Sequence, residues 1–427
     1  MITAAQNELL TRVSSGTPMG ELMRRYWMPA MLSFELPEPD CAPVRLRILG
    51  EDLVAFRDTS GRIGVLTEMC PHRGASLWLG RNEQDGLRCV YHGWKYDVTG
   101  QCVEMMNEPD QFDFSAKVKA RAYATEEFGG IIWMYMGPMD RKPASPKFEW
   151  TQVPEAHRYV TKVVEECNWL QALEGGIDTS HAPIMHRALR KETADLGIPM
   201  DGPFVRGSAP TLEVENTDYG YRYFGIRDMP EGGKYVRGYH FVMPFTQLRP
   251  NEGPKTIVDG HFWVPIDDEN VMVYNFGYSY GTEPLTIEES YGRNAGNNFG
   301  ADIDVEAGFR SVRNADNDWM IDRAAQKTDT FTGIQGINAQ DRAVQESMGR
   351  VMDRTKEHLG AADKAIISTR RLLEQAVQAV ADGADPLGVA PTYYHLRARD
   401  DVVRDGVDWH SMMMGLMYPT EPAATIR

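Results

Sequence analysis

Two short segments, each carrying one cysteine and one histidine, constrain the fold of this 427-residue chain more than any other feature. Cys70-Pro71-His72 is followed after sixteen residues by Cys89, and His92 lies three positions further on, which gives C-x-H-x16-C-x2-H. A zinc finger pairs its cysteines in one segment and its histidines in another. Here each segment supplies one of each. The interleaved order favours two loops that close on a two-iron cluster, with both cysteines on one iron and both histidines on the other.

The residues that flank these ligands resemble the two halves of a Rieske [2Fe–2S] motif, with C-P-H-R-G at 70–74 and C-V-Y-H-G-W at 89–94. The respiratory type carries an additional cysteine in each loop. Those places hold Ala75 and Tyr91 here, so the sequence is similar to the oxygenase type. The cluster ligands that the resemblance implies are Cys70, His72, Cys89 and His92. The other cysteines are expected to be buried thiols, namely Cys41, Cys102 and Cys167.

The composition of the chain limits the kinds of surface that it presents. Its 45 basic and 61 acidic residues give a net charge of −16. This argues against binding to nucleic acid, because phosphate contacts come from clustered lysine and arginine. No apolar run approaches the ~18 residues of a spanning helix. Residues 1–20 lack the basic start and apolar stretch of a signal peptide, so we expect a cytoplasmic protein without a membrane partner.

Local patterns divide the chain into three parts. Residues 45–135 contain short β segments separated by Asp, Gly and Ser clusters, which is typical of a compact all-β module. Residues 6–27 carry apolar side chains at helical spacing, and the three prolines of 139–155 predict a linker. The predicted parts are an N-terminal helical lead at 1–40, a Rieske domain at 41–140 and a catalytic domain at 141–427.

The catalytic part shows strands followed by helices. Alternating segments over 203–280 predict one antiparallel sheet. Residues 340–360 and 362–383 carry apolar side chains at helical spacing, which in the first segment continues to Val351 and Met352. Strands followed by helices, without βαβ alternation, predict an α+β fold. We expect an antiparallel sheet flanked by helices, in a helix-grip (Bet v1-like) arrangement.

A second group of metal-ligand residues begins at Asp178 and reads D-x2-H-x4-H. On a continuous helix Asp178 and His181 would share a face, whereas His186 would be rotated away from them. Pro183 disfavours a helical conformation for Ala182, which predicts a bend that brings both imidazoles to one point. Two histidines and a carboxylate on one face of an octahedron bind iron in non-haem Fe(II) oxygenases. The alternative is a pair of surface histidines on a loop.

With both motifs in this order, the chain resembles the oxygenase α-subunit of a Rieske non-haem iron ring-hydroxylating oxygenase over nearly its whole length. Residues 317–360 resemble the phthalate 4,5-dioxygenase branch, which includes chlorobenzoate and phenoxybenzoate dioxygenases and some aryl O-demethylases. The resemblance implies a Rieske [2Fe–2S] cluster, a mononuclear Fe(II) and O2 as co-substrate. It also implies electrons from NADH, delivered by a separate reductase that contains flavin and a ferredoxin centre.

Spacing alone does not choose the third ligand of the mononuclear iron. The available carboxylates are Asp316, Asp318, Asp322, Asp329 and Asp341. In the family pattern the ligand lies in a Gln-Asp or Glu-Asp pair that opens a late helix, which points to Gln340-Asp341. An Asp in the first turn of a helix also has a purely structural explanation, because the helix dipole and the free N–H groups favour it there.

The resemblance gives Asp178 a separate role in electron transfer. It implies that Asp178 bridges His181 on the iron and His92 of a neighbouring subunit. A carboxylate that accepts N–H bonds from both imidazoles fixes their tautomers and provides a short electron path. In the family the two metal sites of one chain are too far apart for useful transfer, so we expect a homotrimer with no β subunit.

An aromatic acid substrate requires a cation in the pocket, and arginine binds carboxylates in a bidentate manner. The candidates on the predicted sheet are Arg206, Arg222, Arg227 and Arg237. We choose Arg206 because it follows the iron motif closely, although most arginines on such strands face solvent. Asn168 and Ser180 lie near the iron ligands and are expected to line the pocket, unless they are capping residues.

Four functions follow from these motifs. The first is ring dihydroxylation of a phthalate-type aromatic carboxylate. Its close rival is O-demethylation of a methoxylated aromatic or lignin-derived biaryl acid, which uses the same ligands and fold. From other classes, we consider a Rieske electron carrier with a degenerate second domain and a zinc-binding structural protein. The net charge of −16 further suggests docking to a reductase that presents basic residues.

Overall fold

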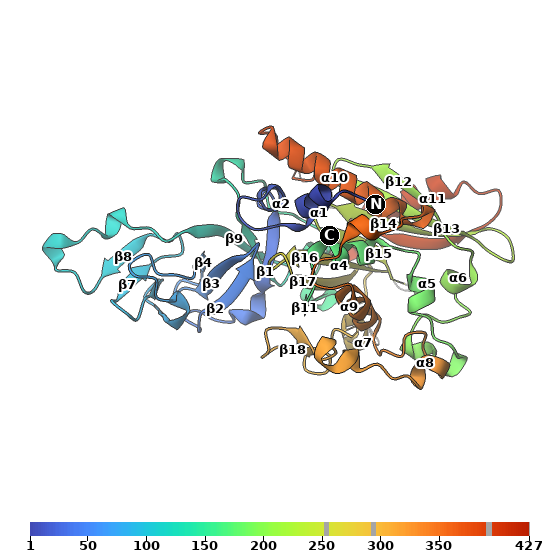
Figure 1. Cartoon of the computed structure of the whole chain (residues 1–427), viewed down its shortest axis with the longest axis horizontal. Helices are drawn as coiled ribbons and strands as arrows, with labels where there is room; N and C mark the ends of the chain where they lie inside the picture. The colour runs from blue at the N-terminus through green and yellow to red at the C-terminus, as the bar shows by residue number, and fades with distance from the viewer. Residues whose placement is uncertain (252–255, 292–295, 390–394, 427) are drawn as a thin grey trace. The chain divides into compact units, whose positions relative to one another are not determined.

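The structure is a computed structural model that describes residues 1–251, 256–291, 296–389 and 395–426. The chain forms two compact units (Figure 1). One unit comprises Val13–Ser145, and the other comprises Met1–Arg12 together with Pro146–Arg427. The domain boundaries at residues 40 and 140 stay predictions.

The unit formed by Val13–Ser145 is built mainly from two antiparallel sheets. The strands of the six-stranded sheet, in spatial order, are β1 (Trp27–Leu32), β10 (Ile131–Tyr135), β9 (Ala122–Phe128), β4 (Ile63–Thr67), β3 (Glu51–Arg57) and β2 (Val44–Ile48). Those of the four-stranded sheet are β5 (Arg81–Glu83), β6 (Gly86–Arg88), β7 (Trp94–Tyr96) and β8 (Cys102–Met105). This confirms the prediction of an all-β module.

One apolar core lies between these two sheets and includes both cluster cysteines. Val54 and Leu66 of the larger sheet and Leu87 of the smaller one belong to it, together with Cys70 and Cys89. The two ligand loops are therefore anchored in the most buried part of the unit.

The N-terminal region contains two short helices instead of one long lead. Helix α1 (Ala4–Thr11) begins with a capping box at Thr3. Helix α2 (Pro18–Met23) begins at the N-cap Thr17, with Pro18 in its first turn. Proline costs no hydrogen bond at this position, because N–H groups in the first turn have no acceptor within the helix.

The other unit is built around a sheet of ten strands, antiparallel except where β11 pairs with β19, which confirms the predicted α+β class. Its main strands, in spatial order, are β12 (Thr211–Asn216), β13 (Gly220–Asp228), β14 (Lys234–Val242), β15 (Thr246–Pro250), β16 (Ile257–Pro265), β17 (Val271–Ser279) and β11 (Arg158–Glu165). The short strands at its margins are β19 (Arg310–Ser311), β18 (Ile303–Asp304) and β20 (Arg399–Val403), which pairs with β14. The central strands are buried along almost their whole length, so both faces of the sheet are covered.

Helices cover this sheet and supply the ligands of the second metal group. The helices of this unit after α1 are α3 (Glu149–Gln152), α4 (Trp169–Ile177), α5 (Ala182–Met185), α6 (Pro203–Arg206), α7 (Ile287–Tyr291), α8 (Ala325–Thr328), α9 (Ile337–Ser347), α10 (Lys364–Ala381) and α11 (Trp409–Met417). Helix α4 contacts α9 as well as β16 and β17, and Figure 1 shows these elements together.

The predicted helix over 340–360 is shorter than its apolar pattern suggests. Helix α9 starts three residues earlier and ends at Ser347, and Val351 and Met352 are not helical. Gly349 adopts φ +89°, a left-handed conformation in which the helix cannot continue, so its apolar repeat does not extend the helix. Helix α10 ends near Gly383 at φ +80°, as predicted. No helix in the described ranges combines the length and apolar character needed to cross a bilayer.

Candidate metal centres

The two loops that carry the cluster ligands have the same backbone geometry. In the first loop Cys70 N–H donates to Ala75 O at 2.9 Å and Gly74 N–H donates to Cys70 O at 2.9 Å. In the second, the corresponding bonds from Cys89 to Trp94 and from Gly93 to Cys89 measure 2.8 and 2.9 Å. Both loops therefore turn back over the ligands in the same way.

A glycine at positive φ closes each of these turns. Gly74 and Gly93 have φ values of +72° and +75°, a conformation that side chains with a Cβ atom disfavour. A Cβ atom on Gly93 would lie 2.7 Å from the Met106 side chain, whereas one on Gly74 would meet nothing within 4 Å.

The four predicted cluster ligands form a pair of buried thiols and a pair of partly exposed imidazoles. Cys70 and Cys89 are buried, and the rings of His72 and His92 lie partly exposed with centroids 4.4 Å apart. Burial and the neighbouring His92 lower the pKa of His72, which favours the neutral imidazole that binds metals. Thiols inside and imidazoles at the surface fit a Rieske cluster, whose histidine edge exchanges electrons.

The second group of ligands is held by helix ends. Asp178 is the C-cap of α4, His181 precedes α5, and His186 is its C-cap. The Asp178 carboxylate accepts from Ser180 N–H at 2.6 Å and lies 3.1 Å from His181 Nδ1. The expectation that Ala182 leaves the helical region is wrong, because Ala182 begins α5. Proline is compatible with the first turn of a helix, and a helix of one turn places the two histidines at its opposite ends.

Asp341 of α9 completes this group. Its Oδ1 lies 3.3 Å from His181 Nε2 and 3.2 Å from His186 Nε2. The ligand atoms of the three side chains lie within 4.8 Å of one another, close enough to bind one metal ion. Asp341 lies in the second turn of α9, one turn beyond the position expected from the sequence. The structure thus brings together the two histidines and the carboxylate favoured by the family pattern.

The electrostatics of this site fit a bound cation. Although burial opposes it, the carboxylates of Asp178 and Asp341 raise the pKa of His181 to about 10. Burial also opposes ionisation of Asp341, but His186 and His181 lower the pKa of this carboxyl well below its usual range. A positive charge at the centre of the site is therefore strongly favoured, and an Fe(II) ion supplies it with the preferred imidazole and carboxylate ligands.

Gln340 holds His186 in place, a role that sequence reasoning missed. Its Oε1 lies 2.9 Å from His186 Nδ1, and its Nε2 donates to Ile334 O at 2.9 Å. Since the Gln340 carbonyl can only accept, His186 carries its proton on Nδ1 and presents Nε2 to Asp341. The Gln-Asp pair served only as a marker of Asp341 in the sequence. No local sequence pattern predicts the contact of Gln340 with His186, which lies 154 residues away.

The other carboxylates considered for the third ligand position have different partners. Asp316 pairs with Arg310, Asp329 pairs with Arg190, and Asp322 accepts from two backbone N–H groups of its own turn. Asp318 lies in a turn with left-handed backbone conformation. None of these four belongs to a group of metal ligands in the described part of the chain.

Comparisons with known proteins agree with this geometry. Residues 26–118 match the Rieske [2Fe–2S] domain family, and residues 134–423 match the family described as LigXa C-terminal domain like. The chain belongs to the Rieske non-haem iron oxygenases. It is therefore an oxygenase, and the alternatives of a zinc-binding structural protein and of a pure electron carrier are wrong. A Rieske cluster and a mononuclear iron are its cofactors.

Relatives of this oxygenase cover its whole length. It is 39% identical to the phthalate 4,5-dioxygenase oxygenase subunit of Pseudomonas putida, over 99% of this chain and 97% of the relative. It is 37% identical to the 3-chlorobenzoate-3,4-dioxygenase oxygenase subunit of Comamonas testosteroni, over 96% and 98%. A solved structure, dicamba monooxygenase with non-haem iron and dicamba, shares the fold with a TM-score of 0.55 at 18% identity, covering 84% of this chain and 99% of that one.

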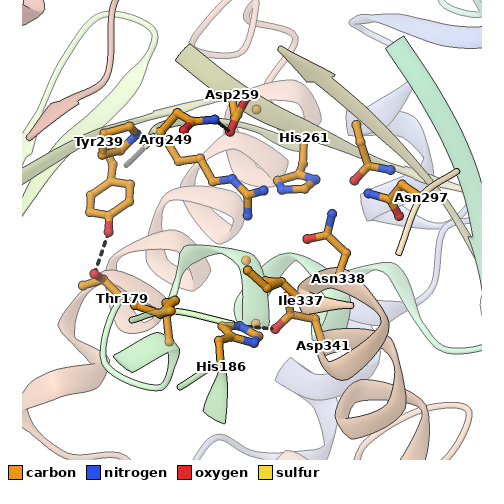
Figure 2. Close-up of a pocket in the computed structure, with 18 of the residues that line it drawn as sticks. Thr179, His186, Tyr239, Arg249, Asp259, His261, Asn297, Ile337, Asn338 and Asp341 are labelled. Carbon is orange, nitrogen blue, oxygen red and sulfur yellow. Dashed lines mark hydrogen bonds and ion pairs between the residues drawn. The ribbon is translucent and has the colours of Figure 1, made fainter. Parts of the chain in front are cut away.

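A cavity of about 360 Å³ opens beside the mononuclear ligands of the oxygenase. In Figure 2, His186 and Asp341 form one side, and Arg249, Asp259 and His261 of the sheet project from the other. This size suits a small organic molecule held next to the metal.

Arg249 is the cation of this cavity that remains available to a ligand. Its guanidinium makes no hydrogen bond or ion pair with the part of the chain that the structure describes. Arg237 also lines the cavity, but it donates to the hydroxyl groups of Tyr239 and Tyr235 at 2.8 and 3.1 Å and to Pro250 O at 2.9 Å. Sequence reasoning missed Arg249, because strand alternation does not distinguish it from other arginines of the sheet.

The residues predicted to bind substrate lie mostly elsewhere. Arg206 is half-exposed and pairs with Glu231, and it is absent from the described cavity lining. Asn168 is fully buried, caps α4 through Leu170 N–H and donates to two backbone carbonyls, so it has the capping role considered as its alternative. Ser180 donates to Asp178.

The remaining two arginine candidates are absent from the described cavity lining. Arg222 pairs with Glu215, and the buried Arg227 donates to Thr179 O at 2.7 Å. The structure therefore replaces Arg206 and Asn168 with Arg249 as the residue positioned to meet a substrate.

Proposed function

We propose that this oxygenase adds both atoms of O2 to the ring of a phthalate-type aromatic carboxylate and forms a cis-dihydrodiol. The observation that carries this proposal is Arg249, an available guanidinium in a cavity whose opposite wall holds His186 and Asp341. A guanidinium binds a carboxylate with two parallel hydrogen bonds, which fixes both the position and the orientation of the ring. The names of the phthalate and chlorobenzoate relatives support an aromatic acid.

The ligand roles within this function are also proposals. Cys70 and Cys89 would bind one cluster iron, and His72 and His92 the other. The mononuclear ligands would be His181, His186 and Asp341. When bound, the metals supply single-electron transfer and activation of O2. The protein's own part is to hold these ligands, keep the cavity dry and orient the acid through Arg249.

Electrons would come from NADH through a separate flavin- and ferredoxin-type reductase. Asp178 would connect His181 to His92 of the partner subunit in a homotrimer, and its contact with His181 Nδ1 at 3.1 Å supports the first half of that path. The parts would be a helical lead at 1–40, a Rieske domain at 41–140 and a catalytic domain at 141–427. The net charge of −16 suits a reductase with a basic docking face, so raised salt should slow electron delivery.

O-demethylation of a methoxylated aromatic acid is the second candidate. It is favoured by 33% identity, over 91% of this chain, to the 5,5'-dehydrodivanillate O-demethylase oxygenase subunit of Sphingobium. Both reactions would use the same ligands and the same arginine. They differ in product, since demethylation releases formaldehyde.

Product analysis separates the two reactions. The loaded oxygenase and a reductase are given phthalates, chlorobenzoates and methoxybenzoates, and O2 uptake is measured together with products. A dihydrodiol formed in proportion to O2 supports the first proposal. Formaldehyde without dihydrodiol supports the second, and uptake with none of these acids contradicts both.

A matched pair of variants tests the carboxylate anchor. Arg249→Gln should raise the KM for the acid substrate about 10- to 100-fold, the value of a hydrogen bond to a charged group. Arg206→Gln removes an arginine outside the described cavity lining and should change KM less than twofold. A larger effect of the Arg206 variant would restore the assignment made from the sequence.

A further inference from the structure

A row of three polar side chains crosses the sheet within the cavity. Thr161 of β11 is the direct cross-strand partner of Asn275 on β17, and Asn275 is the direct partner of His261 on β16. Directly opposed residues share one face of a sheet. All three line the cavity beside the mononuclear ligands, and we refer to them as the polar row.

Each member of the polar row has a buried polar atom without a hydrogen-bond partner. The side chains of Thr161, His261 and Asn275 are 2%, 5% and 5% exposed. The unpaired atoms are Thr161 Oγ1, His261 Nδ1 and Asn275 Nδ2. A buried polar group left unpaired is costly, so three in one row of a cavity wall indicate a partner that comes from outside the chain.

The polar row is uncharged. Burial lowers the pKa of His261 well below its ordinary value of 6.5, so the imidazole is neutral at physiological pH. Asparagine and threonine carry no charge at any pH. The row therefore offers hydrogen bonds to a polar group but does not balance a second negative charge.

The cation and the polar row lie on the same face of the sheet. Arg249 of β15 pairs directly with Asp259, and Asp259 precedes His261 by two residues on β16. Residues two apart on a strand share a face, and diagonal neighbours are ~7–8 Å apart. The guanidinium and the polar row therefore line the same cavity and can contact two substituents of one ring.

The charges of the cavity wall leave no surplus of positive charge for a ligand with several negative charges. Besides the metal ligands and Asp178, the described lining contains two cations, Arg237 and Arg249, and two carboxylates, Asp259 and Glu289. Arg237 already donates to three oxygens. Among the lining residues described, Arg249 is therefore the cation whose N–H donors are open to a ligand carboxylate, and Asp259 beside it leaves no room for a second carboxylate there.

We propose that the substrate is an aromatic monocarboxylate with a second, uncharged oxygen substituent, and that the polar row binds this hydroxyl or ether oxygen. This inference rests on the part of the proposed function in which Arg249 holds a carboxylate, and it replaces the second carboxylate of a phthalate with an uncharged oxygen substituent. The polar row then decides which ring edge faces the metal. It makes Asn275, His261 and Thr161 specificity-determining residues.

Equilibrium binding to the iron-loaded holoenzyme without O2 tests the proposal. Calorimetry compares benzoate, phthalate, the three hydroxybenzoates and the three methoxybenzoates. At least one hydroxy or methoxy acid should bind about five- to tenfold more tightly than benzoate, the gain expected from one hydrogen bond. Phthalate should bind no more tightly than benzoate.

Variants that keep the shape of the row identify its contribution. Asn275→Leu should remove the preference for the substituted acid over benzoate. If the Asn275→Leu variant does not fold, Thr161→Val replaces it as a smaller change. It should reduce the same preference. Ser311→Ala is the matched control, because Ser311 also has a buried unpaired hydroxyl but is absent from the described cavity lining. It should change neither affinity.

The outcomes distinguish this inference from the proposed function. Equal weakening of benzoate and the substituted acid by Asn275→Leu would show that the row is structural. Phthalate as the tightest ligand would overturn the argument from a single available cation. In either case Arg249→Gln would still weaken benzoate if the proposed function holds. Binding of acids that Arg249→Gln leaves unchanged, or no binding of any acid, would overturn both.

Discussion

The two metal centres of this oxygenase are assembled in opposite ways. The candidate cluster ligands come from two adjacent loops between residues 70 and 92, and the loops repeat the same backbone hydrogen bonds. The mononuclear ligands come from a helix of one turn and from α9, and His186 contacts Gln340 across 154 residues of sequence. The first centre depends on local turn geometry, whereas the second depends on the packing of α9 against α4 and the sheet.

This difference explains how each centre tolerates change. A local site is damaged by substitutions within its own loops. A site assembled from distant segments is also damaged by substitutions that disturb the packing between those segments, including substitutions at positions that touch no metal. The following predictions test this contrast.

The largest effects should come from removing a ligand of one centre at a time. His186→Ala should lower oxygenation more than about a hundredfold, since even the loss of a supporting partner costs 10- to 100-fold. The visible spectrum and EPR signal of the Rieske cluster should be unchanged. Cys89→Ser should give the reverse result, with the cluster lost and the mononuclear iron retained. Loss of both metals from either variant would contradict the independence of the two centres.

The next effect concerns the support of His186 by Gln340. Gln340→Leu removes the acceptor for Nδ1–H and should lower the affinity for mononuclear iron about 10- to 100-fold. Gln340→Glu keeps an acceptor oxygen and should retain the iron. Iron content after dialysis against a chelator measures this, with the cluster absorbance as internal control. Equal iron loss from the two variants would show that Gln340 acts only through packing.

A buried acid behind the mononuclear site should make stability depend on pH. Burial raises the pKa of Glu165 to about 8 from its ordinary value near 4.5. The folded protein therefore keeps a proton that the unfolded chain releases between these values, so the free energy of unfolding should fall as pH rises from about 4.5 to about 8. The loss should be on the order of 4–5 kcal/mol, because the two pKa values differ by about 3.5 and a difference of one is worth ~1.4 kcal/mol.

Glu165→Gln should flatten this dependence, which urea unfolding at about pH 5 and about pH 8 would reveal. An unchanged slope in the variant would assign the pH dependence to other groups. The visible absorbance of the cluster reports separately on the unit that lacks Glu165.

The smallest effects should come from the two loop glycines. Gly74→Ala meets no neighbouring atom and should cost only the ~1–2 kcal/mol of a left-handed alanine. Gly93→Ala has the same φ penalty and also approaches Met106 at 2.7 Å, so it should cost more. The temperature at which the cluster absorbance is lost measures both. A greater loss from Gly74→Ala would contradict the proposed role of the Met106 contact.

Much of the fold could be predicted from the sequence. The strand-rich first part, the antiparallel sheet and the late helices follow from periodicity, and two short motifs supplied the candidate cluster ligands. The apolar repeat predicted the wrong end for α9, because the left-handed conformation of Gly349 does not allow the helix to include Val351 and Met352. Sequence reasoning also failed at Ala182, because the position of Pro183 within the first turn decides whether proline breaks or begins a helix.

The sequence by itself determined the chemistry of this protein, namely two loops of Cys and His and a separate pair of His with a carboxylate nearby. Only the tertiary structure decided which carboxylate joins His181 and His186, because Asp316 and Asp329 are held by arginines while α9 carries Asp341 to the imidazoles. It likewise placed Arg249 in the cavity and Arg206 outside its described lining. The physical reason is that ligand type is a property of one residue, whereas charge pairing and burial depend on segments that packing alone brings together.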